Sequence, residues 1–295
     1  MWRQVALTAE VARAEAIADW LVARGALSVS LDDAEDQPLF EPPPGAMPLW
    51  DKTIVTGLFE ADLDPVALIA EARRLFGPAL QAARHEVLED QAWERAWMAH
   101  FRPMQFGRMW VCPSGYDPPD PLAVTVHLDP GLAFGTGTHP TTALCLRWLA
   151  AQDLATLRVL DYGCGSGILA VSALCLGAGS AVGVDIDPQA LEATRDNAQK
   201  NQVGERLLCQ LADTQSLGRF DLIVANILAG PLVSLAPVLA ERLRPGGSLG
   251  LSGILVDQAA EVRSAYAPYL DFDADEVEEG WVLLKGRRLN AEVPD

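Results

Sequence analysis

The stretch VLDYGCGSGILA, residues 159–170, decides the fold of the larger part of this 295-residue chain. An apolar run ends at Asp161, and three glycines follow at every second position, beginning with Gly163. Glycine permits a tight turn and lets a ligand approach the backbone, and the next helix presents free N–H groups. The dinucleotide fingerprint is G-x-G-x-x-G, whereas here the spacing is G-x-G-x-G and Ile168 takes the place of that fingerprint's third glycine. Alone, the stretch predicts a nucleotide-type ligand at a sheet edge or a glycine-rich turn without a ligand.

A second strand ends in an acidic residue. In AVGVDIDPQAL, residues 181–191, Asp185 lies 22 positions after Gly163. A carboxylate there can accept hydrogen bonds from both hydroxyls of an adenosine ribose. Asp187 precedes Pro188, and this pair is typical of a helix cap followed by the first helical position. We therefore assign Asp185 to the ligand and Asp187 to structure.

The region from residue 104 onward alternates between strands and helices. Near-continuous apolar runs are typical of strands buried on both faces of a parallel sheet. The pattern predicts an α/β domain with a Rossmann-like, doubly wound sheet. We expect the C-terminal piece EVEEGWVLLKGRR to form a strand that closes the sheet edge. The expected strands are 123–128, 158–162, 181–185, 207–211, 221–225 and 248–252, and the expected helices are 141–151, 167–177, 188–200 and 231–243.

Two further segments supply polar side chains near this sheet. In DLIVANILAGP, residues 221–231, a strand delivers Asn226 to the carboxyl edge, where open α/β sheets bind ligands. Asn226 can orient a substrate nitrogen or the polar end of a cofactor, or it can simply turn the chain. The segment DPGLAFGTGTHPTT, residues 129–142, is irregular and can fold over a ligand. Its His139 is interpreted as a capping or loop residue rather than as a general base.

The first part of the chain predicts a separate domain. Residues 1–89 show the element order β-α-β-β-α-β, which is that of a smaller α+β, ferredoxin-like domain. Asp64 and Pro65 are expected to begin its second helix. A loop rich in Pro and acidic residues spans 35–48. The expected strands are 2–8, 26–33, 52–60 and 84–89, and the expected helices are 10–24 and 65–76.

Residues 90–103 are expected to form a helical linker to the larger domain, which would span 104–295. Trp93, Trp97 and Phe101 recur every four residues and would lie on one face of that helix. These rings would pack against a neighbouring domain, and Phe101 could in addition wall a cofactor pocket.

The charge of the chain restricts its partners. The 22 basic and 40 acidic residues give a net charge of −18, and residues 1–90 hold 7 of the basic and 16 of the acidic residues. Such a surface repels phosphate backbones and attracts basic partners. The alternative interpretation is that the charge only keeps the protein soluble. The five cysteines are widely spaced and form no C-x-x-C pair, which argues against a zinc site or a disulfide framework. With no apolar run of membrane length and no secretory signal, we expect a cytoplasmic protein that binds neither membrane nor nucleic acid.

These features together resemble the class I methyltransferases, and within them the ribosomal protein L11 methyltransferases (the PrmA family). The resemblance rests on GLAFGTGTHPTT, DYGCGSGILA, GVDIDPQAL with RDNA, ANILAGPL, and LSGIL after RPGG. It covers residues 90–260 closely and residues 1–89 loosely, by element order. It implies S-adenosyl-L-methionine as cofactor, with no metal. The implied contacts are Thr142, Gly163, Asp185 and Asn226, with Gly165, Asp161 and Phe101 as less certain contacts.

The resemblance also implies the reaction. The family methylates lysine side-chain amines and an N-terminal amine on a ribosomal stalk protein, and a monomer is expected. The first domain would recognise this basic substrate, which we expect to be preferred before ribosome assembly. No catalytic base is assigned: water would accept the proton, and Asn226 with nearby backbone carbonyls would orient the amine.

Other functions are weighed against this one. A methyltransferase of the same fold could act on another protein lysine or on a small molecule. A nicotinamide oxidoreductase is disfavoured by the glycine spacing, and a nucleic-acid methyltransferase by the charge and by N-I-L in place of N-P-P-Y. A nonenzymatic binding protein that retained the fold is a further alternative.

Overall fold

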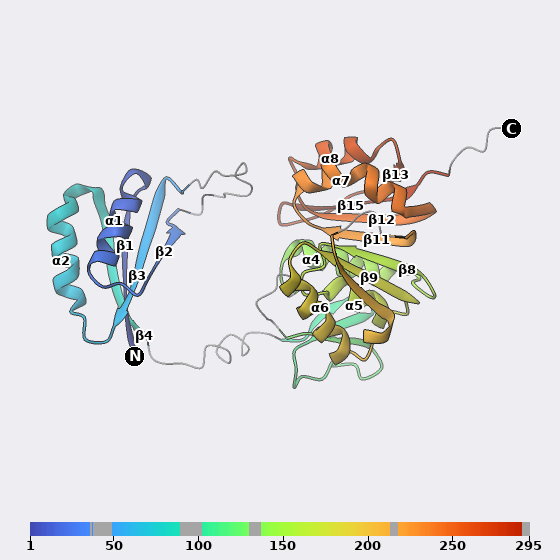
Figure 1. Ribbon diagram of the computed structural model, residues 1–295, viewed down its shortest axis with the longest axis horizontal. Coiled ribbons are helices and arrows are strands. Elements are labelled where there is room, and N and C mark those ends of the chain that lie inside the picture. Colours follow the sequence, from blue (N-terminus) through green and yellow to red (C-terminus); the bar gives the residue numbers. More distant parts are fainter. Residues whose placement is uncertain (36, 38–48, 89–101, 130–136, 213–217, 291–295) are drawn as a thin grey trace. The chain divides into compact units, whose positions relative to one another are not determined.

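The computed structural model describes residues 1–35, 37, 49–88, 102–129, 137–212 and 218–290 (Figure 1). The chain divides into two compact units, residues 1–96 and 97–295. The division falls inside the segment expected to be a helical linker. Residues 89–101 of that segment, including Trp93, Trp97 and Phe101, lie outside the described residues.

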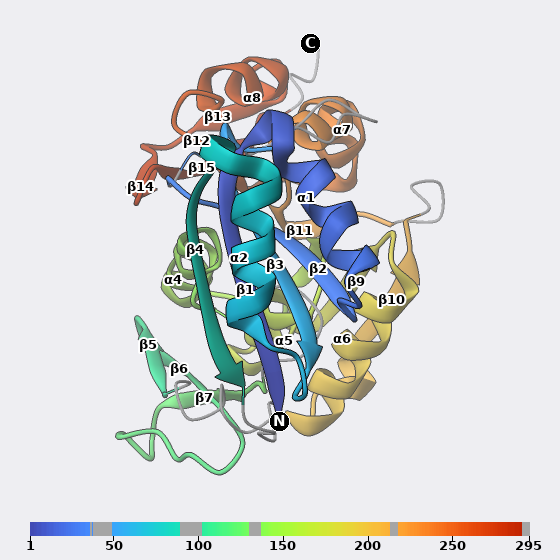
Figure 2. The same ribbon diagram turned by 90° about the vertical axis from the view of Figure 1, so that its left-hand side faces the viewer.

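The first unit is an antiparallel sheet with two helices. The strand order is β2-β3-β1-β4, and both helices lie over one face of the sheet (Figure 2). The ferredoxin-like element order predicted from the sequence is therefore confirmed. Its elements are β1 (Trp2–Glu10), α1 (Val11–Ala23), β2 (Ser28–Asp33), β3 (Lys52–Glu60), α2 (Pro65–Phe76), the short helix η1 (Gly77–Ala79) and β4 (Leu80–Leu88).

Local chemistry explains the bounds of these elements. Asp64 caps α2, because its Oδ1 accepts hydrogen bonds from the N–H groups of Val66 and Ala67 at 3.0 and 3.1 Å. This was the predicted cap, with Pro65 in the first turn. The last strand, β4, begins at Leu80 and not at residue 84 as expected, because it pairs with β1 along nearly its whole length.

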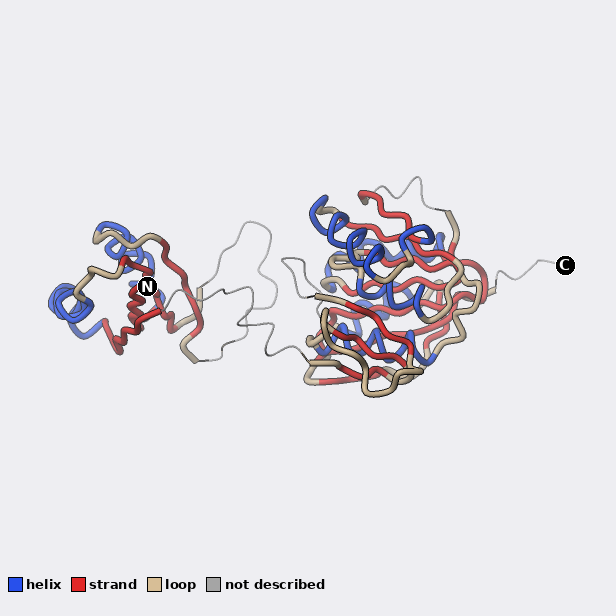
Figure 3. The backbone as a smooth tube through the Cα atoms, turned by 90° about the horizontal axis from the view of Figure 1, so that it is seen from below, coloured by secondary structure: helices blue, strands red, loops and turns tan. Residues whose placement is uncertain are grey.

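The second unit is built on a large mixed sheet, and Figure 3 distinguishes its strands from its helices. The sheet order is β10-β9-β8-β11-β12-β15-β13, with β14 paired to β15. A small sheet of order β5-β6-β7 accompanies it. The large sheet contains β8 (Arg158–Tyr162), β9 (Ser180–Asp185), β10 (Leu207–Leu211), β11 (Phe220–Asn226), β12 (Leu243–Leu255), β13 (Leu270–Phe272), β14 (Glu276–Glu278) and β15 (Trp281–Arg288), and the small sheet contains β5 (Met104–Phe106), β6 (Met109–Cys112) and β7 (Val124–His127).

Helices cover both faces of this sheet, as the doubly wound prediction requires. One buried apolar cluster joins the sheet to α4, α5 and α6, and a second joins it to α7 and α8. The helices are α4 (Pro140–Ala151), α5 (Ile168–Cys175), α6 (Pro188–Lys200), the short η3 (Gly204–Arg206), α7 (Ala229–Arg242) and α8 (Ala259–Tyr266). None of the helices in the described ranges has the length and apolar character needed to cross a membrane.

One prediction about the sheet is wrong. The C-terminal strand β15 does not close the edge: it lies between β12 on one side and β13 and β14 on the other. Val282, Leu283 and Leu284 are all buried, so consecutive side chains on both faces of β15 are covered. A strand covered on both faces is typical of a sheet interior.

The order of the strands fixes where a ligand can bind. β8 lies between β9 and β11, and all three run parallel. From β8 the chain continues to β9 on one side, and from β11 it continues to β12 on the other side. The strand order therefore reverses between β8 and β11, which flank a topological switch point. Open α/β sheets bind ligands at the carboxyl ends of the strands beside such a point.

Candidate ligand-binding site

A cavity of about 490 Å³ opens at the carboxyl ends of β8, β9 and β11. Segments far apart in the sequence form its wall: the first turn of α4, the turn after β8, the end of β9 and the end of β11. Five of the residues predicted from the sequence line it together: Thr142, Gly163, Gly165, Asp185 and Asn226.

The turn after β8 needs its glycines. Gly163, Gly165 and Gly167 have φ angles of +77°, +54° and +76°, in the left-handed region that other residues rarely adopt. A Cβ on Gly163 would lie 2.2 Å from Cγ2 of Ile227, so this position also lacks room for a side chain. The N–H groups of Gly163 and Cys164 both donate to the carbonyl oxygen of Val184, at 2.7 and 3.0 Å. The glycine turn, residues 163–167, is thereby tied to the end of β9.

Asp185 is held in place by two backbone donors. Its Oδ2 accepts a hydrogen bond from the N–H of Gly165 at 2.9 Å, and its Oδ1 accepts one from the N–H of Asp187 at 3.0 Å. Each carboxylate oxygen has a further lone pair that can accept a ligand hydroxyl. Asp187 instead caps α6, because its Oδ1 accepts from the N–H of Gln189 at 2.8 Å. The structure thus separates the two acids as the sequence predicted.

Asn226 and Thr142 meet across the cavity wall. The Nδ2 group of Asn226 donates a hydrogen bond to Oγ1 of Thr142 at 3.3 Å, although the two residues are 84 positions apart. Thr142 is buried in the first turn of α4. Asn226, the last residue of β11, is half-buried, and its amide oxygen can still accept a hydrogen bond from a ligand. This pair is the polar side of the cavity opposite Asp185.

His139 is a helix cap. It is the residue before α4, and its Nδ1 accepts a hydrogen bond from the N–H of Thr141 at 3.3 Å. Its ring makes an edge contact with Trp281, with 5.0 Å between the ring centres. Burial lowers the pKa of His139, while the nearby carboxylate of Glu279 acts in the opposite direction. The capping role fits the interpretation made from the sequence.

The expected contact at Asp161 needs correction. Its side chain is completely buried and does not line the cavity. Its Oδ2 accepts a hydrogen bond from the N–H of Ala170 in α5 at 2.9 Å. Its Oδ1 has no partner among the described residues, and burial raises the pKa of Asp161 to about 7. Asp161 therefore holds the start of α5 through its carboxylate and is not a lining residue of the cavity.

Two other expectations lie outside what the structure describes. Phe101, predicted as a less certain contact, lies outside the described residues, and residues 130–136 of the glycine- and threonine-rich segment do as well. Sequence reasoning also missed the apolar wall of the cavity. Ile186, which follows Asp185 directly, leaves 85% of its surface exposed and lines the cavity with Leu235. A large apolar residue directly after a strand-end acid was the available signal.

The donor set of the cavity fits an adenosyl cofactor. A fixed carboxylate can bind a ribose diol, and the exposed face of Ile186 can cover an aromatic base. The glycine turn exposes its backbone to the cavity, and Asn226 lines the cavity from the end of β11. Within the described ranges, no group of three or more His, Cys, Asp or Glu side chains is placed to hold a metal ion.

A larger hollow elsewhere does not compete with this site. It has a volume of about 650 Å³ and lies between α6 and β10, where Arg195, Gln199 and Glu205 are among its lining residues. It contains none of the glycine turn and lies away from the switch point. Ligands of open α/β sheets bind at that point, so we place the site at the 490 Å³ cavity.

Comparisons with known proteins match the chain to one family. The family model described as "Ribosomal protein L11 methyltransferase (PrmA)" matches residues 1–289. Curated proteins named ribosomal protein L11 methyltransferase from Pseudomonas putida (strain GB-1) and Pseudomonas aeruginosa (strain LESB58) are each 55% identical over 289 residues. Each match covers 97% of this chain, with 99% and 98% of the relatives.

A solved structure is similar as well. The crystal structure of a ribosomal protein L11 methylase from Lactobacillus delbrueckii subsp. bulgaricus superposes with a TM-score of 0.59 at 32% sequence identity. The match covers 64% of this chain and 100% of that one. The family model and the curated relatives therefore give one family over nearly the whole chain, and the solved structure gives the same family over 64% of it.

Proposed function

The chain belongs to the ribosomal protein L11 methyltransferase family, and on that basis we propose that it transfers methyl groups from S-adenosyl-L-methionine to amines of ribosomal protein L11. The observation that carries this proposal is the convergence of Thr142, Gly163, Asp185 and Asn226 on one cavity at the switch point. That cavity can hold an adenosyl group, and the family match indicates ribosomal protein L11 as the protein that accepts the methyl group.

Each side of the cavity has a part in holding the cofactor. Asp185 would accept hydrogen bonds from the ribose hydroxyls, and two backbone N–H groups hold its carboxylate in place for this. Ile186 would cover one face of the base, and the turn at Gly163 would leave room for the chain that joins the ribose to the sulfonium. When bound, the cofactor supplies a methyl group that its sulfonium already activates. The protein then contributes alignment, which can lower the barrier by about 7–11 kcal/mol in well-oriented reactions.

The acceptor amine must be neutral when it attacks. A lysine amine has an ordinary pKa of about 10.4, and burial beside a cationic sulfonium favours the neutral form. Burial raises the pKa of Tyr162 and of Cys164, so both of these cavity residues keep their protons at neutral pH. Asp185 is committed to the ribose. We therefore infer that water accepts the proton, and that Asn226 with the backbone carbonyls of 226–228 orients the amine.

The variant Asn226→Ala tests this role. We expect its turnover number at saturating cofactor to fall at least about tenfold, because the amine loses the group that aligns it. Thr142→Val is the comparison variant: it removes the partner hydroxyl and keeps the Asn226 side chain, and because Thr142 lines the cofactor cavity we expect it to raise the cofactor KM while the turnover number at saturating cofactor stays within about threefold of wild type. Methyl incorporation into L11 is measured for both. A turnover number for Asn226→Ala within about threefold of wild type contradicts the role, and a rise in the cofactor KM alone assigns Asn226 to cofactor binding only.

We further propose that residues 1–89 recognise L11 and that the enzyme acts as a monomer in the cytoplasm, where ribosomal proteins are made. The acidic excess of residues 1–90, with 16 acidic and 7 basic residues, supports this recognition. Opposite charge attracts a basic ribosomal protein, while it repels the phosphates of ribosomal RNA. The free protein, before assembly, is then the preferred substrate.

A further inference from the structure

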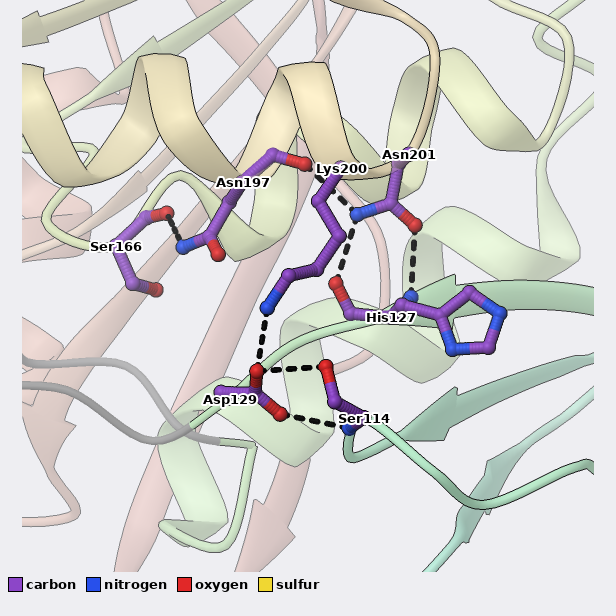
Figure 4. Close-up of polar contacts among 7 residues, drawn as sticks. All are labelled: Ser114, His127, Asp129, Ser166, Asn197, Lys200 and Asn201. Carbon is purple, nitrogen blue, oxygen red and sulfur yellow. Dashed lines mark hydrogen bonds and ion pairs between the residues drawn. The ribbon is translucent and has the colours of Figure 1, made fainter. Parts of the chain in front are cut away.

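Helix α6 contacts the glycine turn with two side chains that do not reach the cavity. Thr194 Oγ1 donates a hydrogen bond to the carbonyl oxygen of Gly165 at 2.9 Å. Asn197 Nδ2 donates one to the carbonyl oxygen of Ser166 at 2.8 Å (Figure 4). We infer that Thr194 and Asn197 are positioning residues that hold the glycine turn in its cofactor-binding conformation. The inference rests on the proposed function only in the identity of the cofactor.

The two contacts follow from the geometry of the helix. Thr194 and Asn197 are three residues apart and therefore share one face of α6. Thr194 is completely buried, and a Cβ on Gly167 would lie 2.7 Å from its Cγ2. The helix is thus packed directly on the turn. The two consecutive carbonyls that face it receive donors from the helix.

These bonds extend the support of the cofactor carboxylate. The N–H of Gly165 donates to Oδ2 of Asp185, and the carbonyl of the same residue accepts from Thr194. Gly165 is therefore held on both sides, through its N–H and through its carbonyl, and a displacement of this residue would break both contacts. A turn with three left-handed glycines has many accessible backbone conformations, so side chains that remove this freedom favour the one that binds.

The same helix offers a built-in comparison. Asn201, one turn after Asn197, donates to the carbonyl oxygen of His127 at 2.7 Å and accepts from the N–H of His127 at 2.7 Å (Figure 4). Lys200 pairs with Asp129, which also accepts two hydrogen bonds from Ser114. The last turn of α6 is thus tied to the segment at the end of β7, while Thr194 and Asn197 hold the glycine turn. Asn201 also donates a hydrogen bond to the backbone carbonyl of Asn197 at 2.8 Å, but among the described residues its side chain makes no hydrogen bond to the glycine turn.

Three variants test the inference. Asn197→Asp keeps the side-chain size but replaces the donor with an acceptor, and Thr194→Val removes the hydroxyl at nearly constant volume. Each should weaken S-adenosylhomocysteine binding, measured by equilibrium titration, about tenfold, because a carbonyl of the glycine turn loses its donor and the turn is no longer held in the binding conformation. The turnover number at saturating cofactor should stay within about threefold of wild type. Thr194→Ser keeps the donor and should bind within about threefold of wild type.

Asn201→Ala is the matched control. It should lower the melting temperature about as much as Asn197→Asp and leave the affinity for S-adenosylhomocysteine within about twofold of wild type. Equal losses of affinity in Asn201→Ala and Asn197→Asp would assign both residues to general stability and overturn the inference. Affinities within about twofold of wild type for both Asn197→Asp and Thr194→Val would do the same.

Failure of the proposed function is a separate result. If the wild-type protein binds S-adenosylhomocysteine but does not methylate L11, the function fails and the binding comparison still decides the positioning role. If the wild type does not bind S-adenosylhomocysteine, amide hydrogen exchange in the free protein tests the positioning role of Thr194 and Asn197 instead. Exchange at Gly165 and Gly167 should be faster in Asn197→Asp and Thr194→Val than in wild type and Asn201→Ala, and unchanged exchange overturns the inference.

Discussion

At the scale of single residues, the position of an aspartate relative to the end of a strand decides whether it lines the cavity, caps a helix or is buried. Asp185 and Asp187 are two positions apart, but only Asp185 lines the cavity. Asp185 accepts from the backbone of the glycine turn, whereas Asp187 accepts from the first turn of α6. Asp161, at the end of the neighbouring strand, is turned inward and buried. Three aspartates close to one turn therefore have three different environments.

Replacement of the two neighbouring acids separates binding from stability. Asp185→Ala should weaken S-adenosylhomocysteine binding about 100-fold, because two charge-assisted hydrogen bonds to the ribose are lost. Asp187→Ala should keep the affinity within about threefold and lower the free energy of unfolding by about 1 kcal/mol through loss of a helix cap. Equilibrium titration and denaturant unfolding measure the two effects. Similar affinities for the two variants would remove Asp185 from the ribose site.

Asp161 should make stability depend on pH. Burial raises its pKa to about 7, from an ordinary value of 3.8. Between these two values the folded state holds a proton that the unfolded state releases, so the contribution of Asp161 to stability falls as the pH rises through about 7. Asn is neutral at every pH, so the Asp161→Asn variant lacks this loss. When the pH is raised from 5 to 8, the free energy of unfolding of wild type should therefore fall relative to that of Asp161→Asn.

Denaturant unfolding at these two pH values measures the effect. Asp187→Asn is a suitable control, since Asn caps a helix about as well as Asp and the position is exposed. This control should follow the wild-type pH profile. Parallel profiles for Asp161→Asn and wild type would mean that Asp161 does not carry the proton in the folded protein.

At the scale of elements, β15 shows what local patterns leave open. Its apolar run was read correctly as a strand, but its place in the sheet was not. It pairs with β12 and also with β13 and β14, and both of its faces are covered. The piece EVEEGWVLLKGRR was expected to be one strand, but it forms two, and its first residues are the separate strand β14 (Glu276–Glu278), which pairs with β15. A continuous run such as WVLL was the better guide to an interior strand.

At the scale of the whole molecule, charge and domain organisation bear on the substrate. The chain forms two compact units, and the first ninety residues hold 16 of its 40 acidic residues. A surface of this sign lowers the affinity for RNA-covered particles and favours a basic protein chain. The catalytic unit contains every described residue of the cofactor cavity. Recognition of L11 by the first unit and cofactor binding by the second can therefore be tested in separate experiments.

Free L11 should be methylated faster than L11 in assembled large ribosomal subunits. The KM for free L11 should also rise with salt, because screening weakens the attraction between opposite charges. Binding of S-adenosylhomocysteine to the largely apolar cavity should change much less over the same salt range and serves as the internal control. Labelled methyl incorporation measures both substrates. Equal rates on free and assembled L11 would refute the preference for the unassembled protein.

The sequence by itself determined the elements and the kind of site. Helix caps such as Asp64 and Asp187, left-handed glycines and apolar runs act over a few residues, so their effects can be read from neighbouring letters. The ordered strand ends placed Gly163, Asp185 and Asn226 at one edge, because parallel strands share their carboxyl ends. The motifs of the glycine turn and of ANILAGPL were sufficient to indicate the family.

Only the tertiary structure decided which distant groups meet. Asn226 bonds Thr142 across 84 positions, and Asn197 bonds Ser166 across 31. No local pattern predicts such pairs, because they depend on how helices pack on the sheet after the strands are in register. The burial of Asp161 and the interior place of β15 have the same origin. A side chain's direction and a strand's neighbours are fixed by packing between elements, which the order of residues along the chain leaves open.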